Sequence, residues 1–184
     1  MNIKVLNVSS FFLNRTSRCN SYSNVTAHIV GKNSQPVTEV CLGCICQAVS
    51  GCKLGTKCEG DHCGLFHITW PYWADGGKHT INGLPEDHPD AYSSCANDPH
   101  CAAHTVQGYM SKYGQDCNGD GQVNCYDYMA IHKKGGYGCS GDLPYDYVNV
   151  FNQCIQKKEK EKVCSEEVYS EPSNQDFESN SLIL

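Results

Sequence analysis

The sequence contains no run of about 18 predominantly apolar residues, so we expect no membrane-spanning helix. It is also poor in basic residues, with 14 Lys and Arg against 20 Asp and Glu, and its net charge is -6 with His neutral. The basic residues are scattered and form no stripe of the kind that binds nucleic acid. Pairs of C-x-x-C do not recur at the spacing of zinc fingers or ribbons. These absences argue against a nucleic-acid partner, a membrane partner and a zinc site.

Cysteine, in contrast, is abundant. The chain has 14 Cys among 184 residues, which is near the level that marks a disulfide scaffold. Because thiols stay reduced in the cytosol, this usage indicates an oxidising compartment, and we expect a secreted, extracellular protein. The N-terminal residues resemble a signal peptide only weakly, since Asn7, Ser9 and Ser10 interrupt their apolar stretch.

Composition divides the chain into three parts. Residues 1–38 lack periodicity and are expected to be poorly ordered, residues 39–157 form one domain, and residues 158–184 are expected to be a disordered charged tail. Cys19 and Cys164 fall outside the domain and either pair with each other or stay free. The domain keeps twelve cysteines, all expected to be in disulfides: Cys41, Cys44, Cys46, Cys52, Cys58, Cys63, Cys95, Cys101, Cys117, Cys125, Cys139 and Cys154.

Apolar spacing and capping residues predict that the domain is mostly helical. Thr38 is a suitable N-cap for a helix that ends at Ser50, and Pro71 fits the first turn of a short helix that stops at Gly76. Residues 62–69 are β-like and predict a short strand or hairpin. Further helices are expected over 90–96, 98–113 and 125–134 and from 144 onward. The predicted fold class is therefore α+β, with many helices, one small β-hairpin and many disulfides.

Residues 116–127, DCNGDGQVNCYD, match the calcium loop of an EF-hand. Calcium needs six to eight oxygen ligands, so oxygen-bearing side chains alternate along a turn that Gly121 permits. The alternative is a solvated turn, and we expect Cys117 and Cys125 to bridge each other inside it. The predicted ligands of a structural Ca²⁺ are the side chains of Asp116, Asn118, Asp120, Asn124 and Asp127 and the backbone carbonyl of Gln122.

Four segments resemble the invertebrate-type lysozymes, the destabilase family. They are CLGCICQAVSGC at 41–52, CGLFHITWPYW at 63–73, CANDPHCAAHTVQGYM at 95–110 and IHKKGGYGC at 131–139. The resemblance implies a lysozyme-like α+β fold and hydrolysis of β-1,4 bonds in bacterial peptidoglycan, without a catalytic cofactor. Family members often carry two more cysteines, at the positions of Gly76 and Thr105. The joint absence of these two cysteines suggests that they form one disulfide in the family, which leaves six disulfides in this domain.

The resemblance also indicates where the catalytic carboxyl groups would lie. Glycoside hydrolysis normally uses one carboxyl group as the acid and a second to attack or stabilise the sugar centre. In active members the acid is a Glu of the first helix, and Val49 stands in its place here. Asp61 matches the second carboxylate, although a shortened segment after it makes a plain turn residue an equal alternative. Glu59 is the other nearby carboxylate.

Two other activities follow from the same segments. Trp70, Tyr72 and Trp73 are candidates to stack against sugar rings, and core packing is the alternative for both tryptophans. An isopeptidase would need a nucleophile and a base. Ser50 and His132 remain for these roles, along with Lys53 and Lys57, but none has a diagnostic spacing. We therefore expect a monomeric lysozyme-family protein that acts on bacterial cell-wall glycan weakly or not at all; the alternatives are a secreted glycan-binding protein and an isopeptidase.

Overall fold

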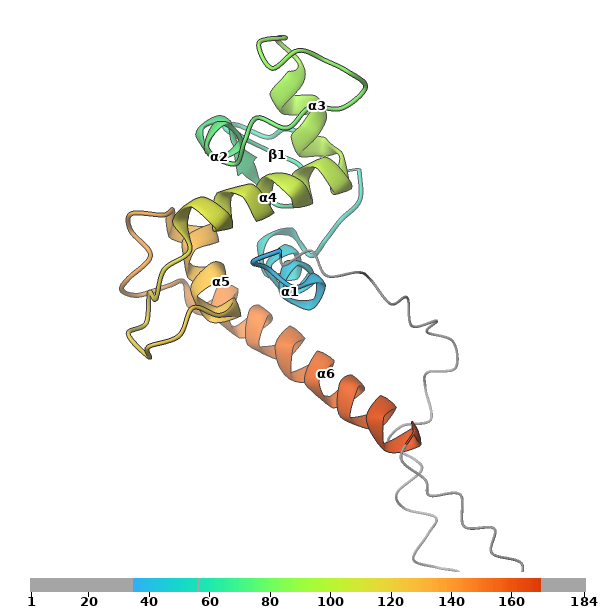
Figure 1. Cartoon of the computed structure of the whole chain (residues 1–184), viewed down its shortest axis with the longest axis vertical. Coiled ribbons are helices and arrows are strands. Elements are labelled where there is room, and N and C mark those ends of the chain that lie inside the picture. Colours follow the sequence, from blue (N-terminus) through green and yellow to red (C-terminus); the bar gives the residue numbers. More distant parts are fainter. Residues whose placement is uncertain (1–34, 56, 170–184) are drawn as a thin grey trace, which may run out of the picture. The chain divides into compact units, whose positions relative to one another are not determined.

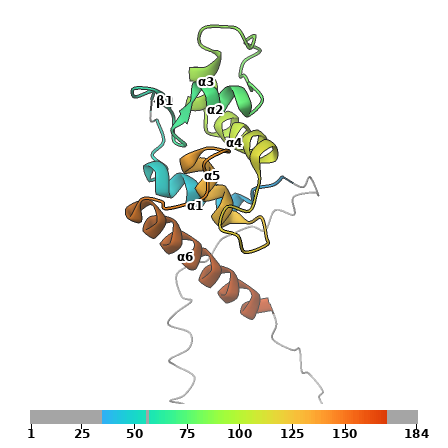
Figure 2. The ribbon, with the colours of Figure 1, turned by 90° about the vertical axis from the view of Figure 1, so that its left-hand side faces the viewer.

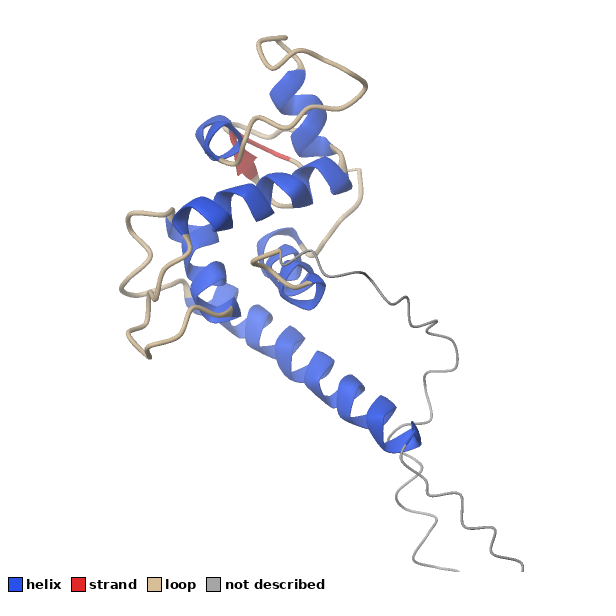
Figure 3. Ribbon diagram, viewed as in Figure 1, coloured by secondary structure: helices blue, strands red, loops and turns tan. Residues whose placement is uncertain are grey.

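The structure, a computed structural model, describes residues 35–55 and 57–169, with side chains as far as residue 162. Most of these residues are helical, and the only described sheet has two short strands (Figure 3). The described residues up to Lys157 belong to one compact unit. The predicted fold class, α+β with a small β-hairpin and many disulfides, is confirmed.

The first helix, α1 (Glu39–Ser50), begins and ends as its sequence predicts. The Thr38 hydroxyl accepts a hydrogen bond from the Cys41 N–H at 3.2 Å, which satisfies one of the amides that a helix start leaves free. Gly51 ends the helix with a φ of 68°, a left-handed conformation that glycine adopts without steric cost. Its buried residues are Cys41, Cys44, Ile45 and Cys46.

The β-hairpin leads directly into the second helix. Strands β1 (His62–Cys63) and β2 (Ile68–Thr69) are antiparallel, with His62 opposite Thr69. The Thr69 hydroxyl then caps α2 (Trp70–Asp75) by accepting from the Tyr72 N–H at 3.4 Å. The predicted hairpin and the short helix with Pro71 in its first turn are both confirmed.

The remaining helices are α3 (Ala91–Asn97), α4 (Pro99–Tyr113), α5 (Cys125–Lys134) and α6 (Tyr145–Tyr169). Asp98 caps α4 by accepting from the Cys101 N–H at 2.8 Å. Helix α4 packs against α2, α3 and α5, and α5 packs against α1. The hairpin, α2 and α3 thus lie on one side of α4, and α1, α5 and the start of α6 on the other (Figures 1 and 2).

All twelve domain cysteines form disulfides, as predicted. One predicted pairing is wrong, because Cys117 and Cys125 do not bridge each other: Cys117 pairs with Cys139 and Cys125 with Cys41. Cys125 is the first residue of α5, which packs on α1 and so faces Cys41, whereas Cys117 precedes the helix. The remaining bridges are Cys44–Cys154, Cys46–Cys52, Cys58–Cys63 and Cys95–Cys101.

Two features differ from the predicted domain limits. Val37, in the segment predicted to be poorly ordered, is 2% exposed. The buried Gln107 side chain holds it, because its amide accepts from the Val37 N–H at 3.0 Å and donates to the Val37 carbonyl at 2.6 Å. At the other end, α6 continues past residue 157 to Tyr169.

The alternatives for Cys19 and Cys164, pairing with each other or staying free, stay predictions. Cys19 lies outside the described residues, as does the side chain of Cys164. Among the helices that the structure describes, none is both long and apolar enough to cross a membrane.

Candidate functional site

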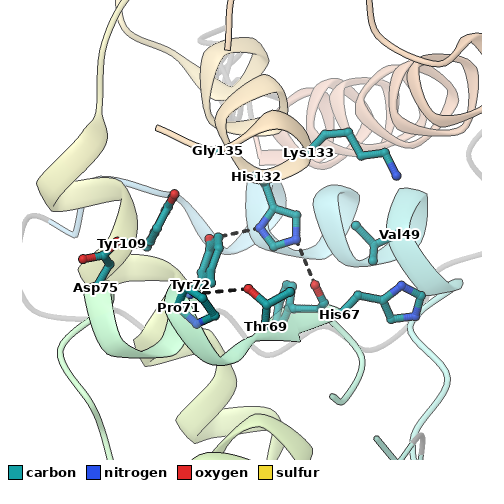
Figure 4. A pocket seen from close by; sticks show the side chains of 11 residues that line it. Val49, His67, Thr69, Pro71, Tyr72, Asp75, Tyr109, His132, Lys133 and Gly135 are labelled. Carbon is teal, nitrogen blue, oxygen red and sulfur yellow. Dashed lines mark hydrogen bonds between the residues drawn. The ribbon is translucent and has the colours of Figure 1, made fainter. Parts of the chain in front are cut away.

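A pocket of about 310 Å³ opens where the hairpin and α2 meet α4 and α5. Its walls combine residues far apart in the sequence, from the end of α1 at Val49 to the end of α5 at Lys133 (Figure 4). The lining residues are Val49, Phe66, His67, Thr69, Pro71, Tyr72, Asp75, Tyr109, His132, Lys133 and Gly135.

His132 ties α5 to the hairpin and α2 from inside this pocket. Its Nε2 lies 2.9 Å from the carbonyl oxygen of Phe66 and its Nδ1 3.0 Å from the Tyr72 hydroxyl. A carbonyl only accepts, so Nε2 carries the proton and Nδ1 accepts from Tyr72. Burial lowers the pKa of His132 to about 4. The ring is therefore neutral at physiological pH, and both nitrogens are occupied.

Tyr72 forms the floor of the pocket with a second tyrosine. Its ring stacks on Tyr109, with centroids 3.7 Å apart and planes 12° from parallel. Burial raises the pKa of Tyr72 well above its usual value, so its hydroxyl stays protonated and donates to His132. The Tyr109 hydroxyl in turn accepts from the Gly136 N–H at 3.1 Å. The pocket floor is thus uncharged and joined by hydrogen bonds to α5 and to the turn after it.

Asp75 supplies the only carboxylate among the lining residues. The Lys112 amine donates to one of its oxygens at 2.6 Å and the Tyr113 hydroxyl to the other at 2.9 Å. These hydrogen bonds, that of Lys112 first, lower the pKa of Asp75. Because a general acid needs a raised pKa, Asp75 is poorly suited to protonate a leaving group.

Val49, which stands where the resemblance places the acid, does line the pocket, at the end opposite Asp75 (Figure 4). It is half-buried and packs against the core. A valine has no proton to give. The position that would deliver an acid to the pocket is therefore apolar.

Asp61 and Glu59 lie outside the lining of this pocket. Glu59 and His62 form an isolated bridge around the turn that holds Asp61, whose side chain is 89% exposed. One Asp61 oxygen lies 3.2 Å from His62 Nδ1. Asp61 thus lies in a turn, which is the alternative that the sequence left open for it. A catalytic role of Asp61 stays a prediction.

The three aromatic candidates have different positions. Tyr72 lines the pocket, and Trp70 is 55% exposed beside Pro71, which also lines it. Trp73 is 1% exposed, and its indole N–H donates to the carbonyl of His79 at 2.8 Å. Core packing, which the sequence left as the alternative for Trp73, is thus the position observed for its ring. Tyr72 and Trp70 remain candidates.

Ser50 and His132 do not form the nucleophile and base of an isopeptidase. The Ser50 hydroxyl lies 2.6 Å from the carbonyl oxygen of Leu65, to which it donates. His132 has no free nitrogen to take a proton from it. The geometry therefore supplies no activated nucleophile from this pair.

The predicted calcium loop is only partly assembled. The side chains of Asn118 and Asn124 converge on one oxygen of Asp120, at 3.1 and 3.4 Å. Asp116 accepts from the Gly119 and Gly121 N–H groups at 2.7 and 2.8 Å.

Asp127 turns away from these residues. It is fully buried and accepts from the Cys117 and Asn124 N–H groups at 2.9 and 2.8 Å, which caps α5. No group of three or more His, Cys, Asp or Glu able to hold a metal occurs among the described residues. The cap of α5 thus takes up Asp127, and also the Asn124 side-chain oxygen, which accepts from the Tyr126 N–H at 2.9 Å. Binding of Ca²⁺ in the loop stays a prediction.

The positions of the two family cysteines missing here lie in contact. A Cβ placed on Gly76 would lie 2.8 Å from Cγ2 of Thr105 and 2.5 Å from its carbonyl oxygen. Helix α2 therefore ends against α4 where the extra family bridge was inferred.

Several site residues were missed by sequence reasoning. Asp75, Tyr109 and Lys133 line the pocket, but their spacing predicts only core or surface positions on helices. His67 follows a buried phenylalanine and adopts a φ of 49°, which a sequence does not reveal. The pairing of His132 with Tyr72 joins residues 60 positions apart.

Comparisons with known proteins agree on one family. The family model described as Destabilase matches residues 38–154. "Invertebrate-type lysozyme 3" of Caenorhabditis elegans is 36% identical over 118 residues, which cover 62% of this chain and 84% of that protein. "Lysozyme" of Magallana gigas is 36% identical over 109 residues, which cover 56% of this chain and 69% of that protein. A crystal structure of Meretrix lusoria lysozyme in complex with Aeromonas hydrophila PliI has a TM-score of 0.49 and 30% identity, and covers 64% of this chain and 89% of the solved one.

Proposed function

The chain belongs to the Destabilase family, and we propose that it is a secreted, monomeric member that binds bacterial cell-wall glycan but hydrolyses its β-1,4 bonds weakly or not at all. Its curated relatives include proteins named as lysozymes. The family membership supplies the substrate class, and the chemistry of the pocket supplies the limit on hydrolysis.

The observation that carries this proposal is the set of ionisable groups in the pocket. The acid position holds Val49, and the one lining carboxylate, Asp75, is engaged by Lys112 and Tyr113. His132 is neutral and bonded at both nitrogens. Loss of a positioned proton donor typically slows such a reaction by about 10²- to 10⁴-fold, so strong muramidase activity is not expected.

The same pocket keeps features that suit a sugar ring. Thr69 and Tyr72 place hydroxyl groups beside apolar surface from Phe66 and Pro71. The exposed ring of Trp70 follows directly, and aromatic faces cover the apolar side of a sugar while its hydroxyl groups stay in water. The pocket therefore has groups that can contact a sugar but no group suited to protonate its leaving oxygen.

The test is sedimentation of the oxidised protein with insoluble peptidoglycan. We expect the wild type to bind, and Trp70→Ala to bind several-fold less because it removes an exposed aromatic face. Tyr145→Ala is a matched control, since Tyr145 is 79% exposed and does not line the pocket. No binding by the wild type, or equal loss in both variants, would contradict the proposal.

A further inference from the structure

Two basic side chains lie beside Val49 in the pocket. Lys133, near the end of α5, and His67, in the turn before β2, both line the same end of the pocket as Val49 (Figure 4). Their charges influence each other, because Lys133 contributes to lowering the pKa of His67. The end of the pocket where a catalytic carboxyl group is expected therefore carries basic groups around an apolar residue.

The Lys133 amine lacks a carboxylate partner among the residues that the structure describes. Its Nζ makes a cation–π contact with Tyr147, 5.4 Å from the centroid of the ring. Other lysines do pair with a carboxylate, for example Lys112 with Asp75 and Lys158 with Glu161. An ammonium group at the wall of a pocket that has no carboxylate partner favours ligands with an anionic group.

Negative charge elsewhere in the pocket does not cancel this cation. Asp75 lies at the other end and is paired with Lys112 at 2.6 Å. Asp61 and Glu59 are exposed residues outside the lining. Apolar Val49 keeps the space between the basic groups free of a competing carboxylate.

We propose that this end of the pocket, formed by Lys133, His67 and Val49, binds the carboxylate of an acidic sugar. The inference rests on the proposed glycan-binding function and adds the class of sugar. The carboxylate takes the place of the protein's own missing acid, with Lys133 donating a charge-assisted hydrogen bond.

Acid strengthens this binding through His67. The groups that act on its charge are His62, with ring centroids 4.3 Å apart, Glu59 and Lys133. Burial first, then His62, lower the pKa of His67, while Glu59 opposes them. His67 is thus neutral at about pH 7.5 and gains charge as the pH falls below its ordinary value of about 6.5. Neighbouring His132, whose pKa is about 4, stays neutral through most of this range.

Calorimetric titration of the oxidised full chain tests the proposal with two related sugars. N-acetylmuramic acid carries a carboxylate and N-acetylglucosamine does not. We expect the wild type to prefer the acidic sugar by about tenfold, the effect of one hydrogen bond to a charged group at a partly exposed site. The preference grows as the pH falls below about 6.5 and His67 gains charge. Lactate, which has the carboxylate without the ring, is expected to bind far more weakly than either sugar.

Variants separate the two basic groups from general effects. Lys133→Met is expected to remove the preference while N-acetylglucosamine still binds, and His67→Gln to remove its growth with acid. Lys157→Met is the matched control, because it deletes an exposed charge that does not line the pocket. Val49→Glu supplies an internal partner for Lys133 and is also expected to abolish the preference. Melting curves establish that each variant is folded.

The outcomes distinguish this inference from the function on which it rests. If neither sugar binds to the wild type, the glycan-binding function itself fails. If both sugars bind equally, or Lys133→Met keeps the preference, glycan binding stands and the acidic-sugar site is refuted. Lactate that binds as tightly as N-acetylmuramic acid would make the site a general carboxylate receptor and refute selection of a sugar.

Discussion

His132 makes the folded protein sensitive to acid, because the pocket holds its ring in the neutral form. The ring donates through Nε2 to the Phe66 carbonyl and accepts at Nδ1 from the Tyr72 hydroxyl. Its pKa is about 4 in the folded chain and about 6.5 in the unfolded chain. Between these values the unfolded state binds more protons than the folded state. The free energy of unfolding therefore falls as the pH falls from about 6.5 towards about 4.

The size of this effect follows from the two pKa values. Each pKa unit corresponds to about 1.4 kcal/mol, so His132 alone removes at most about 3 kcal/mol, with most of the loss reached by about pH 4.5. That is a large share of the roughly 5–15 kcal/mol that stabilises a typical domain. Above about pH 6.5 the effect of His132 vanishes, because both states are neutral there.

Urea unfolding of the wild type and of His132→Gln, at about pH 7.5 and about pH 4.5, measures this contribution. The glutamine keeps a donor and an acceptor but does not titrate. We expect the wild type to lose about 2.5 kcal/mol more than the variant over this interval. Every other histidine is common to both proteins and cancels in the comparison. Equal losses in the two proteins would refute a neutral, buried His132.

Three other perturbations follow from the described contacts. Asp127→Ala should lower the free energy of unfolding by about 3 kcal/mol, because a buried carboxylate that caps α5 is lost. Asp120→Ala, at an exposed site, should lower it by less than about 1 kcal/mol. Equal losses in the two variants would contradict the capping role of Asp127. The pair Gly76→Cys and Thr105→Cys should form a seventh disulfide worth less than the roughly 3 kcal/mol of an unstrained bridge, because a Cβ at Gly76 would lie 2.5 Å from the Thr105 carbonyl oxygen and α2 must shift to admit it; two titratable thiols in the folded variant would rule it out. Calcium should raise the melting temperature of the wild type but not that of Asp116→Asn. If the wild type has the same melting temperature in calcium and in a chelator, the calcium site is absent.

Local features of this fold were predictable from the sequence because their causes are local. Thr38 and Asp98 carry the side chains that helix starts require, and Gly51 has the freedom that a left-handed helix end needs. The hairpin before α2 followed in the same way from β-like residues bounded by a proline. Even the contact between positions 76 and 105 was implied, although only through the resemblance to a family.

Features set by packing were not predictable. Nothing near Cys117 indicates a partner 22 residues away rather than the nearby Cys125, because the orientation of α5 on α1 decides the matter. Val37 lacks a periodic context, and its burial depends on Gln107, 70 residues later.

The pocket shows the same division between local and packing-dependent features. Its acid position was located by motif. The pairing of Asp75 with Lys112, and the contact of the Lys133 amine with Tyr147 rather than with a described carboxylate, depend on how the helices meet. Trp70 and Trp73 are close in sequence and even touch, with ring centroids 6.4 Å apart, yet only one reaches solvent. Burial along one short helix separates residues that sequence alone treats alike.

The most direct test of the central claim is release of reducing ends from purified peptidoglycan by the oxidised wild type, beside Val49→Glu. We expect release at background by the wild type, because no acid lines the pocket, and a gain in the variant that regains one. Release by the wild type at a rate equal to or above that of Val49→Glu would contradict the loss of the acid. It would mean that another carboxyl group, Glu59 or Asp61, delivers the proton from outside the pocket described above.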